Sequence, residues 1–209
     1  MMVLSIKTQS NPKDENAICT IELSDGSVFF IKPCYLSSQF RDDISEILNK
    51  EISFEEEEDI RFAAYCFQAE EAALRLIARA EQTSLGLSLK LQQRSHNKSC
   101  VKKVIDRLLE KEILSDSRYA RAWLESRLIK RGETPRSLLA GLYNKGIDRK
   151  NAVSILKSLL PFEEELNLLE KYIEKNKLSV KDEKSSMKSK LQYEGFSADA
   201  IQEVLEGDL

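Results

Sequence analysis

Few side chains of this sequence could do covalent or metal-dependent chemistry, and their spacing is poorly suited to it. The 209 residues include one histidine, His96, and four well-separated cysteines, Cys19, Cys34, Cys66 and Cys100. No two cysteines have the Cys-x-x-Cys spacing of zinc and redox sites. A single histidine excludes a two-histidine metal site, and a Ser-His-Asp triad would have to use His96. We expect no enzyme activity, no cofactor and no metal, and four reduced thiols in a cytoplasmic protein.

Longer motifs give the same result. The sequence contains no phosphate-binding loop, no G-x-G-x-x-G, no G-x-S-x-G and no H-E-x-x-H. No apolar run approaches the roughly 20 residues that a membrane span needs. No apolar segment typical of a signal peptide follows Lys7. We therefore expect a protein without membrane contact that acts by binding.

Charge is strongly segregated along the chain, although the formal net charge is only -3. Residues 1–71 carry 6 Lys and Arg against 15 Asp and Glu, residues 72–160 carry 19 against 8, and residues 161–209 carry 7 against 12. The basic middle segment would attract a polyanion or an acidic protein surface. The alternative is that the acidic ends fold back and neutralise it, and the sequence leaves both interpretations open.

Ten basic residues of this middle segment are candidate binding residues: Arg75, Arg79, Arg94, Arg118, Arg121, Arg127, Lys130, Arg131, Arg136 and Lys145. Arg118 and Arg121 are three residues apart and share a helix face, and Trp123 and Arg127 have i, i+4 spacing. Arginine forks suit phosphate and carboxylate groups. The other interpretation is a solvated charged face, with Trp123 in the core and Arg127 lying over it.

The elements that would position these residues are mostly helical. With only 7 Gly and 4 Pro, the chain has too few turn residues for an all-β fold. A β-hairpin is predicted over residues 17–33, because Asp25-Gly26 separates two β-prone runs. A short helix is predicted over 36–50. A long helix follows from Phe54 to about Ala80, with Ser53 and Glu56 in capping-box spacing.

A pattern of a leucine, two variable residues, a charged residue, a small residue and a bulky residue recurs three times. Its copies are residues 91–96, 142–147 and 191–196, offset by 51 and 49 residues. Gly146 and Gly195 suit the left-handed end of a helix, whereas Ser95 in the first copy predicts a tighter or more strained turn. The next residue, Asn97, Asp148 or Ser197, is in each case a good helix N-cap.

An apolar stripe with i, i+3, i+4 spacing follows each cap. Its members are Val101, Val104 and Ile105; Ala152, Ile155 and Leu156; and Ile201, Val204 and Leu205. Earlier helices are predicted over 72–80, 117–131 and 163–175, and Thr134-Pro135 should begin another. The fold class is therefore mainly α, with three tandem three-helix repeats in an elongated, curved array and a small N-terminal β-hairpin.

The predicted domain boundaries follow from this repeat. Residues 1–53 form an N-terminal segment with the hairpin and short helix, and 54–114 hold the long helix and the first repeat, which itself covers 72–114. Residues 115–161 form the second repeat and 162–209 the third. We expect a monomer.

Several stretches of the chain resemble the RecX family of recombination regulators. They are Ala73–Arg79 with Leu89–Leu91, Val104–Leu108 with Ile113–Ala120, then Trp123, Arg127 and Leu142–Ile147. The resemblance covers about residues 60–160 well, and residues 161–209 mainly through Gly195-Phe196 and its flanks. Ser95-His96 stands where the family usually has Gly-Phe, and Glu112 where it often has Gly, so the local turn geometry should differ.

The resemblance implies a non-enzymatic regulator in DNA repair, homologous recombination and the SOS response. Family members bind the RecA recombinase in the groove of its filament on single-stranded DNA, block filament extension, and suppress ATP hydrolysis and strand exchange. For this chain the resemblance implies the RecA filament as partner, with single-stranded DNA as a further candidate, both contacted through the ten basic residues. The alternative is a helical nucleic-acid-binding module that acts without RecA, whose affinity would fall steeply with salt.

Overall fold

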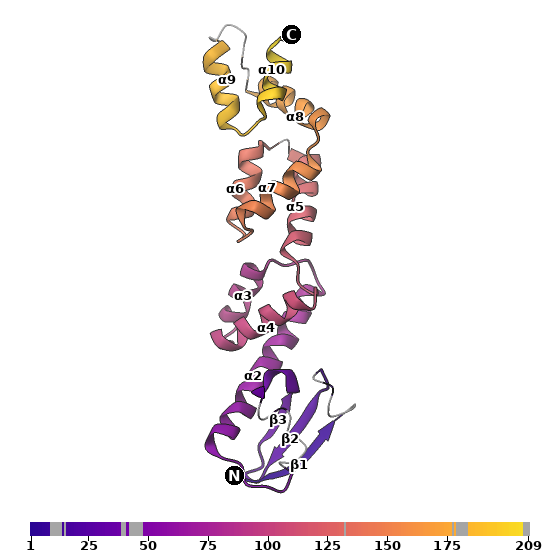
Figure 1. The fold of residues 1–209 in the computed structure, drawn as a ribbon, viewed down its shortest axis with the longest axis vertical. Helices are drawn as coiled ribbons and strands as arrows, with labels where there is room; N and C mark the ends of the chain where they lie inside the picture. Colours follow the sequence, from indigo (N-terminus) through magenta and orange to yellow (C-terminus); the bar gives the residue numbers. More distant parts are fainter. Residues whose placement is uncertain are drawn as a thin grey trace. The chain divides into compact units, whose positions relative to one another are not determined.

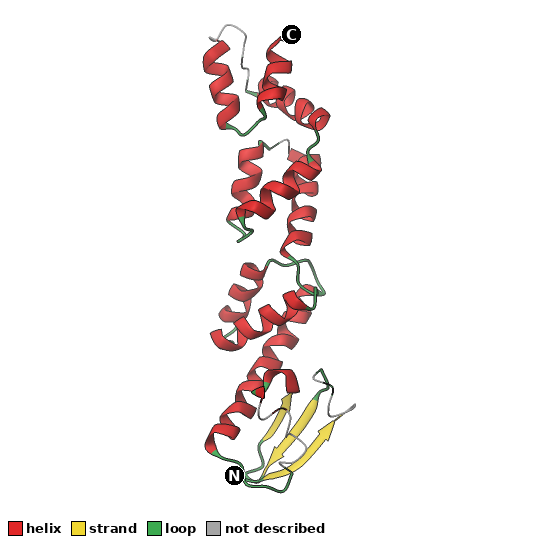
Figure 2. Cartoon of the chain, in the orientation of Figure 1, coloured by secondary structure: helices red, strands yellow, loops and turns green. Residues whose placement is uncertain are grey.

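The computed structural model describes residues 1–8, 14, 16–38, 41, 48–131, 133–176, 178 and 184–206. The chain divides into two compact units (Figure 1). Unit 1 comprises Met1–Ala80 and Gly86–Leu114, and unit 2 comprises Glu81–Leu85 and Ser115–Leu209. Figure 2 shows that the described strands all lie near the N-terminus of unit 1 and that helices dominate the rest. No helix in these described ranges is both long enough and apolar enough to cross a bilayer.

Unit 1 begins with a three-stranded antiparallel sheet in the order β1 (Val3–Thr8), β2 (Cys19–Leu23), β3 (Val28–Ile31). The predicted hairpin is confirmed as β2 and β3, and the Asp25-Gly26 turn puts Gly26 at φ +85°. The sequence prediction missed β1, whose Leu4 is the extra residue of a β-bulge between Val3 and Ser5. A short 3-10 helix, η1 (Pro33–Tyr35), follows β3. The predicted helix over 36–50 falls mainly on residues outside the described ranges.

Nine helices follow in the described residues. They are α2 (Phe54–Ile77), α3 (Ser84–Gln93), α4 (Lys98–Glu110), α5 (Asp116–Arg131), α6 (Pro135–Tyr143), α7 (Arg149–Leu159), α8 (Phe162–Lys175), α9 (Lys184–Tyr193) and α10 (Ala198–Glu206). They form three triplets in which the first and third helices pack together, α2 with α4, α5 with α7 and α8 with α10. The prediction of a mainly helical chain of three-helix repeats is confirmed. The repeat boundaries at 114/115 and 161/162 stay a prediction.

Three helices end in the same hydrogen-bonded turn at the recurring pattern, so the different turn geometry expected at Ser95 is not found. The amide of His96 donates to the Leu91 carbonyl at 3.2 Å, and the amide of Ser95 to the Gln92 carbonyl at 3.0 Å. The same two bonds recur at residues 142–147 and 191–196. This is the Schellman arrangement, which requires a left-handed residue after the helix. Gly146 has φ +84° and Gly195 has φ +89°, and Ser95 adopts the same conformation at φ +65°.

The predicted N-caps and stripes follow these turns. Asn97 and Asp148 accept hydrogen bonds from the amides of Ser99 and Asn151, and Ser197 accepts one from Ala200. The stripe residues listed above are all buried except Leu205, which is half-buried. The long helix α2 begins at the predicted capping box, in which the side chains of Ser53 and Glu56 each accept the other residue's amide.

Two of the three turns need glycine for a second reason. A Cβ on Gly146 would lie 2.7 Å from Cβ of Leu85, and one on Gly195 would lie 3.1 Å from the amide nitrogen of Arg136. In both cases the turn approaches a residue of the same unit that is distant in the sequence, Leu85 or Arg136. Ser95 carries a Cβ in the same left-handed conformation.

We expect Ser95→Gly to raise the free energy of unfolding of unit 1 by up to about 1 kcal/mol. A left-handed conformation costs an L-residue about 1–2 kcal/mol, and the greater backbone entropy of glycine offsets about 0.5–1 kcal/mol of the gain. Hydrogen exchange of the amides of unit 1, recorded at increasing urea concentrations, measures this free energy. Arg94→Gly, one residue earlier at negative φ, is the matched control and should destabilise unit 1. Equal destabilisation by both variants would contradict the strain argument.

Candidate partner-binding surface

The three predicted cations of unit 1 are solvent-exposed. Arg75 lies on α2, and Arg79 and Arg94 lie just after the ends of α2 and α3. Arg75 pairs with Glu71 at 3.7 Å across one helix turn, but both side chains are largely exposed. A pair of this kind contributes little to stability. Arg75 can therefore exchange this partner for another at little cost.

Helix α5 of unit 2 divides its predicted cations between two faces. Arg118 and Arg121 are on the exposed side, where Arg118 pairs with Glu81 at 2.5 Å and Arg121 lies 3.5 Å from Oγ of Ser158 on α7. Arg127 is nine residues from Arg118, which at 100° per residue is the opposite side of the helix. The structure therefore does not bring the arginines of α5 onto one face. The side chains of Lys130 and Arg131 lie outside the described residues.

Two of the predicted cations lie over the ring of Trp123. The guanidinium of Arg127 lies 4.6 Å from the centroid of the Trp123 ring, and the ammonium of Lys145 lies 5.9 Å from it. Lys145 is also 5.8 Å from the ring of Tyr119. Trp123 is half-buried against the core of unit 2, and Arg127 is further held by an ion pair with Glu133. Arg127 therefore packs over Trp123, as in the second of the two interpretations that the sequence left open, and this gives the arginine a role in the fold.

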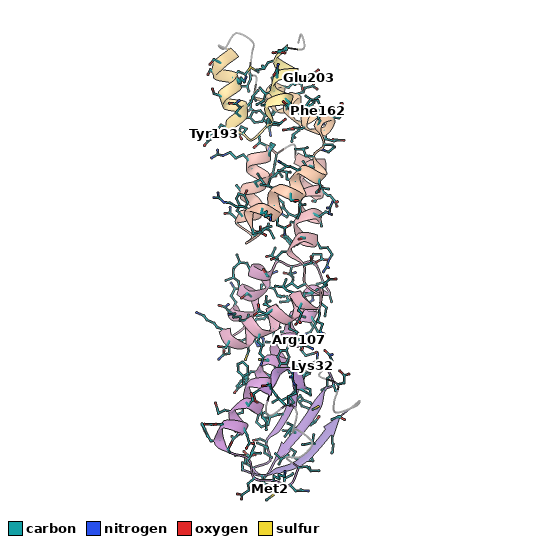
Figure 3. All side chains as sticks on the ribbon, in the orientation of Figure 1. Met2, Lys32, Arg107, Phe162, Tyr193 and Glu203 are labelled. Atoms are coloured by element: carbon teal, nitrogen blue, oxygen red, sulfur yellow. The ribbon has the colours of Figure 1, made fainter. Side chains whose placement is uncertain are left out.

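Arg136 is held in a second cluster at the start of α6. Its guanidinium lies 3.7 Å from the centroid of the Tyr193 ring and 3.3 Å from the Tyr193 carbonyl. The amide of Arg136 donates to the Glu194 carbonyl at 2.9 Å, and the Thr134 hydroxyl donates to the Glu194 carboxylate at 2.9 Å. Tyr193, labelled in Figure 3, is 62% exposed. The cluster therefore joins α6 to the end of α9 and leaves an aromatic face open to solvent.

The sequence prediction also missed cations that lie over aromatic rings, and the one in the described part of unit 2 is Arg149. Arg149 lies with its guanidinium 5.5 Å from the centroid of the Tyr143 ring, across the turn that contains Gly146. Tyr143 and Arg149 are six residues apart on two different helices, so helical spacing in the sequence could not predict their contact. The described residues of unit 2 thus form three cation–aromatic clusters, centred on Trp123, Tyr193 and Tyr143. Positively charged groups over rings are typical of single-stranded nucleic acid grooves, and also of structural cation–π packing.

The ring of Trp123 packs directly against the backbone of Gly141, because glycine has no side chain there. A Cβ on Gly141 of α6 would lie 3.0 Å from Cζ2 of Trp123, and closer still to Cη2. We expect Gly141→Ala to destabilise unit 2 by about 1–3 kcal/mol through overpacking, although alanine gains about 1 kcal/mol in helix propensity. Urea unfolding followed by fluorescence of Trp123, the single tryptophan, measures both effects. Ala140→Gly, on the exposed side, is the control for propensity alone, and stabilisation by Gly141→Ala would contradict the close contact.

Three of the four cysteine thiols are buried where their reactivity is suppressed. Burial raises the pKa of the Cys19, Cys66 and Cys100 thiols, so they stay protonated and unreactive. Cys34 is half-buried. Burial, with smaller contributions from nearby arginines, lowers the pKa of His96, which occupies the turn position that Ile147 and Phe196 fill in the other repeats. Over the described ranges, no three His, Cys, Asp or Glu side chains are grouped as metal ligands.

Comparison with known proteins agrees with this architecture. No protein-family model matches the chain. The chain is 35% identical over 114 residues to the regulatory protein RecX of Treponema pallidum (strain Nichols), an alignment that covers 54% of this chain and 70% of the relative. It is 38% identical over 81 residues to the regulatory protein RecX of Mycobacterium sp. (strain JLS), covering 39% of this chain and 44% of the relative.

Two crystal structures share the fold. A regulatory protein RecX aligns over 99% of both chains with a TM-score of 0.67 at 15% identity. RecX from Lactobacillus salivarius aligns over 68% of this chain and 96% of its own, with a TM-score of 0.55 at 21% identity. The helix triplets thus define a helical-repeat protein. By its identity to the treponemal protein, the chain belongs to the RecX family.

Proposed function

We propose that this protein binds the RecA recombinase filament on single-stranded DNA and inhibits its extension, ATP hydrolysis and strand exchange. Membership of the RecX family, whose named relatives are regulatory proteins, is the observation that carries the proposal. On this proposal the protein is a cytoplasmic monomer without enzyme activity that acts in DNA repair, homologous recombination and the SOS response.

The charge distribution supports the proposal physically. Residues 72–160 hold 19 Lys and Arg against 8 Asp and Glu, and such a surface attracts DNA phosphates or an acidic protein face. Arg75, Arg79, Arg94 and Arg121 are exposed and remain available to a partner. Arg127 and Arg136 already pack on aromatic rings, so they contribute charge while holding the fold.

One observation favours the second candidate, a nucleic-acid-binding module that acts without RecA. Tyr193 is exposed beneath the Arg136 guanidinium, and Trp123 is half-buried beneath two cations. Aromatic faces next to cations can stack nucleic acid bases. This candidate differs from the first in requiring no protein partner.

A titration of the chain into RecA filaments on single-stranded DNA distinguishes the two candidates. If the first is right, DNA-dependent ATP hydrolysis falls at chain concentrations well below those that saturate the same DNA in the absence of RecA. If the second is right, inhibition follows occupancy of the bare DNA and disappears when DNA is in excess. Unchanged ATP hydrolysis at saturating chain would contradict both.

A further inference from the structure

The sheet of unit 1 has an open edge at β3. At the start of the opposite edge, main-chain hydrogen bonds join Val3 of β1 to residues 49 and 50: the amide of Val3 donates to the Lys50 carbonyl at 3.2 Å, and the amide of Asn49 donates to the Val3 carbonyl at 2.9 Å. No strand or loop among the described residues pairs with the outer edge of β3. Figure 1 shows β3 beside α2, with β1 on the other side of the sheet. Helix α2 packs against β3 without using its main-chain groups.

The register of the hairpin determines which groups face this edge. The Leu23 amide donates to the Ser27 carbonyl at 2.9 Å, and Ile21 is opposite Phe29. Because hydrogen-bonded positions alternate in an antiparallel pair, Phe29 and Ile31 bond to β2, and the amides and carbonyls of Val28 and Phe30 point outward. The edge therefore presents two donors and two acceptors in strand geometry.

The side chains at the same two positions are apolar and exposed. Val28 is 51% and Phe30 54% exposed, whereas Ile31 is fully buried. Natural edge strands are usually protected by charges, proline or a covering segment. Here β3 presents valine and phenylalanine at the positions where an added strand would pair and pack. These are the features by which a sheet edge binds an extended peptide.

Charge decides which peptide fits. The two cations nearest β3 are already held, Lys32 by Glu70 at 3.0 Å and Arg61 by Glu57 at 2.7 Å. Glu22 is opposite Val28 in the register, and residues 1–71 hold 15 acidic against 6 basic residues. This acidic excess repels a second copy of the sheet. Two paired four-residue strands would also fall well below the roughly 1,000 Å² that a stable interface needs.

We propose that the β3 edge binds an extended segment of a partner protein in which apolar residues alternate with lysine or arginine. The segment adds a fourth strand by pairing with the main chain of Val28 and Phe30, and its apolar side chains pack on theirs. Its cations face the acidic surroundings of the hairpin. This binding site is independent of the basic surface proposed above and does not require RecA.

The test uses the full chain and a short synthetic peptide that alternates lysine and valine. We expect the peptide to bind and to slow hydrogen exchange at the amides of Val28 and Phe30. A peptide with the same side chains, N-methylated along one edge, and a peptide that alternates glutamate and valine should each bind at least about tenfold more weakly. Phe30→Pro removes an outward amide that β2 does not use, so the sheet should still fold but no longer bind the peptide. Phe30→Thr keeps the amide and removes the aromatic ring, so it measures the contribution of the side chain to peptide binding separately.

Three results would overturn the proposal. One is failure of the lysine–valine peptide to bind the full chain. Another is that the chain binds the N-methylated peptide as tightly as the unmodified one, or that the Phe30→Pro variant binds the unmodified peptide as tightly as the parent chain does. Circular dichroism checks that the Phe30→Pro variant is folded. The third is slowed exchange at Val28 and Phe30 that appears without peptide as the chain concentration rises, because it would show that a second copy occupies the edge.

Discussion

Replacing Gly146 by alanine is expected to lower the free energy of unfolding of unit 2 by about 2–5 kcal/mol. The left-handed conformation at φ +84° accounts for about 1–2 kcal/mol of this loss. The contact with Leu85 accounts for the rest, because a Cβ would lie 2.7 Å from the Leu85 Cβ and overpacking costs about 1–3 kcal/mol. Urea unfolding followed by Trp123 fluorescence measures the change in unit 2.

Gly26→Ala is the matched control for this substitution. Gly26 has φ +85°, almost the same as Gly146, but a Cβ there would meet nothing within 4 Å. Its loss of stability should therefore be the conformational part alone, about 1–2 kcal/mol, measured in unit 1 by hydrogen exchange. If the two alanine variants lose the same free energy, the approach of the turn to Leu85 does not constrain residue 146.

Reversing the charges of Arg118 and Arg121 together is expected to raise the chain concentration needed for half-inhibition of RecA ATP hydrolysis about tenfold or more. Each reversal replaces an attraction to phosphate or carboxylate by a repulsion, and about 1.4 kcal/mol in total is a factor of ten. Both residues are exposed, and the ion pair of Arg118 with Glu81 lies at the surface. The fold should therefore tolerate Arg118→Glu and Arg121→Glu.

Lys171→Glu with Lys175→Glu is the control of equal charge change. These two lysines are exposed on α8, one helix turn apart, in the acidic C-terminal segment. This variant should inhibit nearly as well as the parent, and added salt should weaken the parent more than the Arg118/Arg121 variant. Equal loss in the two variants would show that only net charge matters. Full inhibition by the Arg118/Arg121 variant, with helix content intact, would place the binding surface elsewhere.

Arg127 is unsuitable for the same experiment. Its guanidinium lies over Trp123 and pairs with Glu133, so Arg127→Glu would disturb packing as well as charge. The sequence placed Arg127 with the other arginines of α5 because all carry the same charge and fall in one helix. The structure separates them, since helical rotation over nine residues turns Arg127 away from Arg118.

The sequence alone determined the local features of this fold. Helix ends depend on interactions within a few residues, so Asn97, Asp148 and Ser197 could be predicted as caps and Gly146 and Gly195 as left-handed turn residues. The same holds for the Asp25-Gly26 hairpin and the capping box of α2. Family membership also followed from the sequence, because residues 60–160 preserve the pattern of these local signals.

Only the tertiary structure decided what depends on residues distant in the chain. Strand β1 gains stability by pairing with β2, which lies more than ten residues further along the chain. The contacts of Arg136 with Tyr193 and of Gly146 with Leu85 join positions far apart in the sequence. No periodicity within one element encodes such distances. For the same reason, charge alone predicted ten candidate cations, and only packing separated those that hold the fold from those left exposed to a partner.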